Sequence, residues 1–98
     1  MIREKDVEAH LVRQCKKAGL LLRKVSWVGH NHAPDRLIMS PGATVWVELK
    51  APGRKARPGQ VREHERMRAA GQRVDVIDSK EGVDELINEI GRLNDGRT

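Results

Sequence analysis

Residues 34–50 read PDRLIMSPGATVWVELK, and this stretch decides how the rest of the chain is arranged. Pro41-Gly42 supplies a turn between two apolar runs, which is typical of a β-hairpin. Side chains alternate faces along a strand, so Glu48 and Lys50 point to the same face of the returning strand. That strand is otherwise apolar on both faces, as expected for a covered central strand. A carboxylate there is costly to bury unless it is paired or binds a cation.

Asp35, at the start of the hairpin, adds a second carboxylate to this face. Two carboxylates and a lysine that converge on one sheet face can hold a divalent cation and a water molecule beside a phosphate. Hard ions such as Mg²⁺ and Mn²⁺ prefer carboxylate, carbonyl and water oxygens. The stretch therefore predicts chemistry on phosphate groups, with Asp35, Glu48 and Lys50 as its first candidates.

Hydrophobic periodicity predicts further elements on both sides of the hairpin. Val7, Leu11, Cys15 and Ala18 recur at helical spacing, with Val12 widening the stripe, and Gly19 ends that helix. Ser79 is expected to cap the last helix, and residues 94–98 are expected to be frayed. The predicted order is αβββαβα, an α/β sandwich, with helices at about 4–18, 58–70 and 80–93 and strands at 20–28, 35–40, 43–50 and 74–78.

Length and composition indicate one domain spanning residues 1–98 and exclude several classes of protein. No apolar run is long enough to span a membrane, and the charged N-terminus lacks an apolar signal region. The single cysteine excludes an internal disulfide, fits a reducing compartment and makes a zinc site with the scattered histidines improbable. A domain this small has an economical core, so a partner subunit would help to stabilise it.

The net charge of +5 is unevenly distributed along the sequence. Residues 51–73 carry seven basic side chains against two acidic ones, whereas residues 78–95 are mainly acidic. Such asymmetry is typical of a protein with one face toward a polyanion and the other toward solvent, although a charged run is often only a solvated surface.

Several motifs lie in the expected order along residues 4–90. They are Glu8 in the first helix, His32-Ala33-Pro34-Asp35-Arg36, Val47-Glu48-Leu49-Lys50, Pro58-Gly59-Gln60 with His64, and Arg68-Ala69-Ala70-Gly71 before the strand Val74-Asp75-Val76-Ile77. Together they resemble the PD-(D/E)XK nuclease superfamily and, within it, the virus-type replication-repair nuclease (VRR-NUC) family. The resemblance implies a restriction-endonuclease-like αβββαβ core with a mixed central sheet flanked by helices, extended here by a C-terminal helix. The family usually has glycine at the position of Ala33, so the backbone there must avoid positive φ.

The resemblance also implies roles for individual residues. Asp35, Glu48 and the backbone carbonyl of Leu49 would ligate Mg²⁺ or Mn²⁺. Lys50 would position the attacking water and stabilise charge on the phosphate. Glu8, which the helical pattern alone presents as an ordinary boundary glutamate, would hold a water of the metal or assist a second ion. Gln60 would orient Lys50 or the scissile phosphate.

The expected substrate is DNA, duplex or branched. Contacts to its phosphates are expected from a set of basic side chains and one histidine: His32, Arg36, Arg54, Lys55, Arg57, Arg62 and Arg66. By resemblance, short stand-alone members are phage or prophage proteins that act in the cytoplasm of a bacterial or phage-infected cell. They cut branched DNA such as four-way junctions as homodimers, since two cuts need two sites related by a two-fold axis. A non-catalytic DNA-binding subunit and a nuclease acting on flap DNA or RNA are the alternatives.

Overall fold

The computed structural model describes residues 1–96, and within them it confirms the predicted order of helices and strands. A four-stranded mixed sheet in the order β1-β2-β3-β4 forms the middle layer. The first three strands are antiparallel, whereas β4 runs parallel to β3. The elements are α1 (Glu4–Ala18), β1 (Leu21–Lys24), β2 (Arg36–Met39), β3 (Thr44–Leu49), α2 (Pro58–Ala69), β4 (Val74–Ile77) and α3 (Lys80–Asp95).

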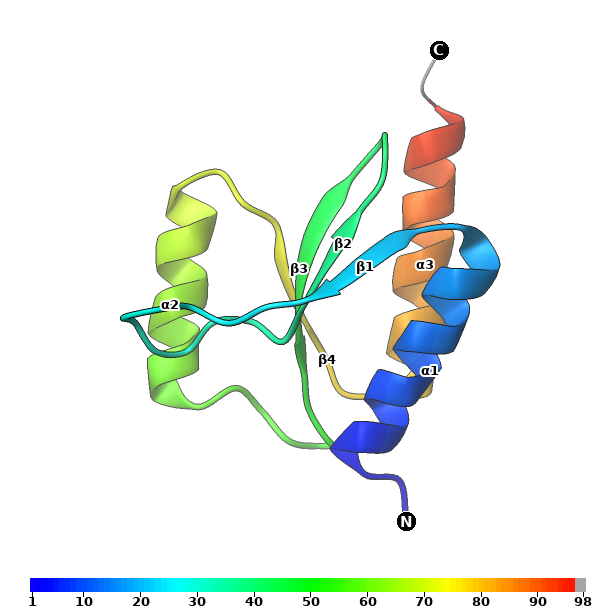
Figure 1. Cartoon of the computed structure of the whole chain (residues 1–98). Coiled ribbons are helices and arrows are strands. Elements are labelled where there is room, and N and C mark those ends of the chain that lie inside the picture. The colour runs from blue at the N-terminus through cyan, green and yellow to red at the C-terminus, as the bar shows by residue number, and fades with distance from the viewer. Residues whose placement is uncertain (97–98) are drawn as a thin grey trace.

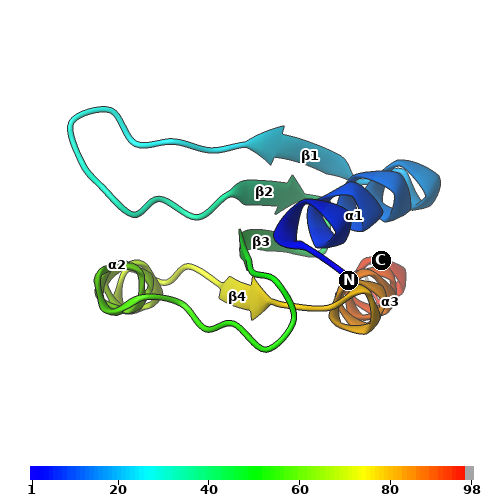
Figure 2. The same ribbon diagram turned by 90° about the horizontal axis from the view of Figure 1, so that it is seen from below.

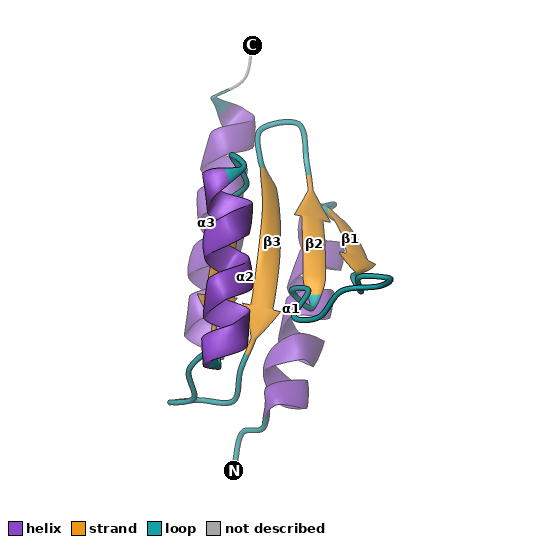
Figure 3. Cartoon of the chain, turned by 90° about the vertical axis from the view of Figure 1, so that its left-hand side faces the viewer, coloured by secondary structure: helices purple, strands orange, loops and turns teal. Residues whose placement is uncertain are grey.

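The helices cover the two faces of the sheet unequally. Helices α1 and α3 pack side by side on one face, and α2 lies alone on the opposite face (Figure 1). The view from below separates the three layers, with the sheet between α2 and the α1–α3 pair (Figure 2). Seen from its α2 side, the molecule presents α2 in front of the sheet (Figure 3). No helix within residues 1–96 is long and apolar enough to cross a lipid bilayer.

Helix α1 shows how the sequence pattern becomes a packed face. Val7, Leu11 and Cys15 are buried in the core. Burial also raises the pKa of the Cys15 thiol to about 11, so it stays protonated and serves as a small apolar side chain. The helix ends at Gly19, which adopts φ +71 as predicted. Val12 and Ala18 are exposed, so the predicted stripe was too wide.

The two faces of the sheet differ in chemical character. On the α1–α3 side, Ile38, Val45, Val47 and Leu49 are buried in an aliphatic core with α1 and α3. On the α2 side, the buried side chains of residues 44–50 and of α2 are mostly polar or charged: Glu48, Lys50, Gln60, Glu63 and His64. Within α2, Met67 is the one buried residue that is apolar. The helix is attached to the sheet mainly by polar groups.

The first strand is shorter than predicted. The pairing of β1 ends at Lys24, and a last backbone bond joins the Val25 N–H to the Asp35 carbonyl at 3.0 Å. The chain then leaves the sheet and runs toward α2, where the Trp27 ring packs at a tilt against Trp46 with 5.6 Å between centroids. The prediction of a strand to residue 28 was therefore wrong, because Trp27 packs outside the ladder and Val28 is fully exposed.

The end of α3 is also better anchored than the sequence predicted. Asn94 and Asp95 are helical, and the Asn94 side chain accepts the Gly42 N–H at 2.6 Å and the Ser40 hydroxyl at 3.1 Å. These bonds fasten the helix to the β2–β3 turn, so the expectation of fraying fails at residues 94–95. Residues 97–98 lie outside the described part of the chain. The predicted cap is confirmed, since the Ser79 hydroxyl accepts the Gly82 N–H at 2.9 Å.

Candidate active site

Asp35 immediately precedes β2 and turns its side chain toward the end of β3. Its N–H donates to the Val47 carbonyl at 3.0 Å, while the next residue, Arg36, is the ladder partner of Val47. Asp35 and Arg36 therefore both lie opposite Val47. This two-to-one pairing is the pattern of a β-bulge, a feature common beside active sites. Asp35 Oδ2 accepts the Leu49 N–H at 2.7 Å. The carboxylate is thereby fixed beside the last residue of β3.

Glu48 is the most deeply buried carboxylate of the candidate site, with 2% of its surface exposed. Its Oε2 accepts the Gln60 amide at 3.3 Å and lies 3.9 Å from Lys50 Nζ. Its Oε1 has no hydrogen-bond partner within residues 1–96. Burial and the neighbouring Asp35 carboxylate raise the pKa of Glu48 to about 8, against the opposing effect of Lys50. Lys50 alone therefore does not offset the burial of Glu48 beside a second carboxylate.

Helix α2 brings two further polar side chains to Glu48. Gln60 anchors the start of the helix, since its Oε1 accepts the Arg57 N–H at 2.9 Å while its amide reaches Glu48. The prediction assigned Gln60 to Lys50 or to the substrate, whereas in this structure it holds the glutamate. His64 Nε2 lies 3.4 Å from Glu48 Oε1 but makes no hydrogen bond within the described chain. Burial, with nearby Arg68 and Lys50, lowers the pKa of His64, which favours the neutral ring.

The donor atoms at the end of β3 fit a hard divalent cation. Asp35 and Glu48 supply oxygens, and one Glu48 oxygen is buried without a partner within residues 1–96. The Leu49 carbonyl points to the same side of β3 as the N–H that meets Asp35. No group of three or more histidine, cysteine or acidic side chains suited to a metal occurs in the described chain. An ion here would need carbonyl, water or phosphate oxygens, as is usual for Mg²⁺.

The structure does not bring Glu8 to these carboxylates. Glu8 Oε2 instead accepts Arg36 Nε at 2.9 Å, so the predicted metal role of Glu8 stays a prediction. The α1 carboxylate whose charge reaches Glu48 belongs to Glu4, one turn earlier, which lines a surface pocket with Lys50. Sequence reasoning missed Glu4, although its i, i+4 spacing to Glu8 places both on one helix face.

Basic side chains surround the mouth of the site on the α2 side. A pocket of about 300 Å³ is lined by Glu4, Lys50, Ala51, Arg54, Lys55 and Arg57. Arg54, Lys55, Arg57 and Arg62 are exposed and form no ion pair with any residue of 1–96. These four side chains are available to phosphate groups.

Three other arginines are held by carboxylates. Arg36 is 15% exposed in its pair with Glu8, and Arg66 binds Glu63 at 2.8 Å. For Arg36 and Arg66, the predicted contacts to DNA phosphates therefore compete with these ion pairs inside the protein. Arg73 binds Asp75 and Glu89 through two hydrogen bonds to each carboxylate.

His32 lies beside the site in a constrained conformation. Its φ is +70, which is uncommon outside glycine. The predicted avoidance of positive φ at Ala33 holds, because the turn takes its positive φ one residue earlier. The His32 ring sits against the first turn of α2, where a Cβ on Gly59 would lie 2.5 Å from its Nε2. The ring is therefore seated where α2 lacks a side chain.

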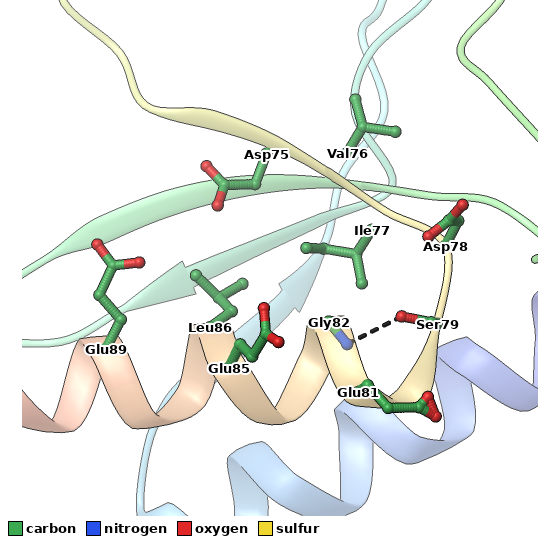
Figure 4. A pocket seen from close by; sticks show the side chains of 10 residues that line it. All are labelled: Asp75, Val76, Ile77, Asp78, Ser79, Glu81, Gly82, Glu85, Leu86 and Glu89. Atoms are coloured by element: carbon green, nitrogen blue, oxygen red, sulfur yellow. Dashed lines mark hydrogen bonds between the residues drawn. The ribbon is translucent and has the colours of Figure 1, made fainter. Parts of the chain in front are cut away.

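A further hollow of the surface, here called the acidic groove, lies elsewhere, between β4 and α3 (Figure 4). Its volume is about 370 Å³, and five carboxylates line it: Asp75, Asp78, Glu81, Glu85 and Glu89. Such a concentration of negative charge repels a polyanion. A nucleic acid is therefore expected away from this hollow, beside the exposed Arg54, Lys55, Arg57 and Arg62.

Comparisons with known proteins agree with this arrangement. The chain is 44% identical over 82 residues to "Putative nuclease p44" of Acyrthosiphon pisum secondary endosymbiont phage 1, which covers 83% of this chain and 88% of that protein. A solved structure described as "VRR_NUC domain" superposes with a TM-score of 0.80 and 38% identity, covering 90% of this chain and 97% of that one. No family model matches the sequence.

Proposed function

Because this chain belongs to the VRR-NUC family of nucleases, with their restriction-endonuclease-like α/β fold, we propose that it hydrolyses phosphodiester bonds of DNA with Mg²⁺ or Mn²⁺. The observation that best supports this proposal is the state of Glu48. It is a buried carboxylate beside a second carboxylate, its pKa is raised to about 8, and one of its oxygens has no partner in the described chain. A divalent cation bound here would offset the negative charge of both carboxylates and would give the unpartnered Glu48 oxygen a ligand.

The residues of the site divide the work in this proposal. Asp35, Glu48 and the Leu49 carbonyl hold the ion, which when bound neutralises charge on the phosphate and lowers the pKa of a water molecule. Lys50 carries a positive charge at the same face and stabilises the charge that develops on the phosphate oxygens. Gln60 and His64 keep Glu48 in position from α2. Arg54, Lys55, Arg57 and Arg62 bind neighbouring phosphates.

We further propose that the substrate is branched DNA, such as a four-way junction, and that the protein cuts it as a two-fold homodimer. The similarity to a phage nuclease supports an action in the cytoplasm of a bacterial or phage-infected cell. Symmetric cutting needs two sites on a two-fold axis, which a homodimer supplies. Sedimentation of the protein at working concentrations tests the dimer, and a monomer would contradict it.

Cleavage assays test the central proposal. Purified protein with Mg²⁺ or Mn²⁺ is incubated with labelled duplex, flap, single-stranded and four-way-junction DNA, and with matched RNA. We expect cutting of DNA, strongest for the junction. Asp35→Asn and Glu48→Gln should each lower the single-turnover rate by about 100-fold or more, since each removes an ion-binding oxygen.

The matched control is Glu85→Gln, which removes a carboxylate from the acidic groove on the other side of the sheet. It should cut at the wild-type rate. The proposal fails if the wild type cuts no substrate, or if Asp35→Asn and Glu48→Gln cut as well as Glu85→Gln. Mg²⁺ calorimetry distinguishes a nuclease from a non-catalytic DNA-binding subunit, for which no ion binding at Glu48 is expected.

A further inference from the structure

The segment from Val25 to Asp35 is fastened to α2 although it belongs to no strand. Its two ends meet in the Val25–Asp35 backbone bond. Between them, Trp27 Nε1–H donates to Glu63 Oε2 at 2.7 Å, and His30 Nε2 lies 3.3 Å from Glu63 Oε1. One carboxylate of α2 thus holds the segment at two points.

Glu63 is a buried residue that holds this segment against α2, and it is not an exposed charge. It is 7% exposed, and Arg66 also binds its Oε1, with 3.0 Å from Arg66 Nε. A buried carboxylate with this many donors is well compensated. The His32 ring, seated over Gly59, adds a further contact between the segment and α2. The segment is therefore held in one position relative to the helix.

A pocket of about 340 Å³ lies between this segment and α2, and we call it the loop–α2 pocket. At one end it reaches Asp35 and Gln60, so anything bound in it lies beside the proposed chemistry. Its remaining lining is mostly polar: Val25, Ser26, Trp27, His30, Asn31, His32, Ala33 and Arg57. Arg57 also lines the basic pocket that contains Lys50, and thus joins the two hollows across the site.

We propose that the loop–α2 pocket binds the nucleotide next to the scissile phosphate, and that Glu63 is a positioning residue that keeps the pocket in shape. This inference rests on the proposed nuclease function. The backbone of a continuous duplex presents phosphates to a protein surface, and phosphate contacts need no pocket. A pocket with hydroxyl, amide and imidazole groups beside an indole suits a base with its sugar.

The test combines changes in the protein with changes in the DNA. On the substrate that the wild type cuts fastest, the nucleotides flanking the mapped cut are replaced one at a time by an abasic residue. At one of the two positions we expect the wild-type single-turnover rate to fall about 10-fold, as for loss of a bound base. His30→Ala, whose side chain is 58% exposed, should slow the intact substrate and cause no further loss on the abasic one.

Glu63 is tested on the same pair of substrates. Glu63→Ala should slow the intact substrate far more than the abasic one. Glu63→Gln, which keeps an oxygen for the Trp27 N–H, should recover part of the rate. A merely structural role would slow both substrates equally. His10→Ala, which removes a histidine that contacts Asp84 of α3 on the other side of the sheet, is the control and should match the wild type.

The possible failures are distinguishable. If the wild type cuts no substrate, the proposed nuclease function fails and the pocket assignment fails with it. If the wild type cuts but abasic substitution on either side leaves its rate unchanged, only the pocket assignment is refuted. Equal slowing of intact and abasic substrates by His30→Ala and Glu63→Ala would refute it as well.

Discussion

At the scale of single residues, Glu48 has the largest influence on how the protein responds to pH. Its carboxyl ionises near 4.5 in the unfolded chain and near 8 in the folded one. Between these values the folded state keeps a proton that the unfolded state has lost, so stability is greatest below the lower value and declines toward the higher one. His64, whose pKa is lowered, destabilises the fold only as pH falls below about 6.5.

The metal-free protein should therefore lose about 1–2 kcal/mol of unfolding free energy between pH 6.5 and 8. Urea denaturation at several pH values in the presence of a chelator measures this loss. The range from pH 6.5 to 8 lies above the pH values at which protonation of His64 changes the unfolding free energy. A stability that rises across this window would contradict the burial of an uncompensated Glu48.

Glu48→Gln is the control for that measurement, and it has an expectation of its own. Without an ionisable group at this position, the slope between pH 6.5 and 8 should disappear. The variant should also be more stable than the metal-free wild type at pH 8, by about 1–2 kcal/mol, since a buried charge is gone. Saturating Mn²⁺ should stabilise the wild type, by about 2.7 kcal/mol at 100 times the dissociation constant, and leave the variant unchanged.

At the scale of elements, the packing of His32 against Gly59 sets the distance between the segment before β2 and the start of α2. Gly59→Ala should lower cleavage about 10-fold or more, because the new Cβ occupies the place of the His32 imidazole and pushes the segment that carries Asp35 away from α2. Single-turnover rates and thermal denaturation measure the effect. At a helical position with no side chain packed against the glycine, replacing glycine by alanine would instead stabilise the protein.

A double-variant cycle tests whether the two positions act on each other. His32→Gly removes the ring and relaxes the positive φ. In that background, Gly59→Ala should no longer destabilise and should gain about 0.5–1 kcal/mol. Additive effects of the two substitutions would mean that the His32 ring does not rest on Gly59 in solution.

The contact between α3 and the β2–β3 turn gives a second prediction at this scale. Gly42→Ala would bring a Cβ to 2.6 Å from Asn94 Oδ1 and the Leu93 carbonyl, and should cost about 1–3 kcal/mol. Gly91→Ala, in the same helix but with open space around it, should stabilise by about 0.5–1 kcal/mol. Urea denaturation compares them. Equal effects would mean that the end of α3 is frayed, as the sequence alone suggested.

The order of elements and the Asp35–Glu48–Lys50 group were predictable because each has a local signal. Periodicity marks α1 and α3, Pro58 and Gly71 mark the ends of α2, and a lone carboxylate in an apolar strand marks Glu48. Glu63 had no such signal, since beside Arg66 it reads as an ordinary exposed helical pair. Its burial comes from Trp27 and His30 on a distant segment, whose path no local pattern encodes. Glu8 was assigned by resemblance, and its partner, Arg36, is apparent only once α1 is docked on the sheet.

At the scale of the whole molecule, one basic and one acidic region of the surface lie apart from each other. The basic residues surround the site on the α2 side, and the acidic groove lies between β4 and α3 (Figure 4). DNA is therefore expected to approach from the α2 side only. The attraction depends on exposed arginines and lysines and is sensitive to salt.

The salt dependence of DNA binding tests this orientation. In an Asp35→Asn background, which is expected to slow cutting, Arg54→Ala and Arg62→Ala should each make the slope of log K against log salt shallower by about 1. Fluorescence anisotropy at several salt concentrations measures the slopes. Arg13→Ala, an exposed arginine of α1, is the control. If it changes the slope as much as Arg54→Ala does, DNA is not confined to the α2 side.

The unequal faces of the sheet also limit how this protein can evolve. One face is filled with aliphatic side chains, whereas the groups that fasten α2 to the other are largely those of the proposed active site. A lineage that abandoned catalysis would have to rebuild the interior beneath α2, since single losses at Gln60 or Glu63 leave buried groups unpaired. Folding itself therefore resists the loss of these α2 side chains. It does not protect Glu48, whose replacement by glutamine is expected to stabilise the metal-free protein, so selection for a stable fold alone would keep the interior beneath α2 and lose the ion site.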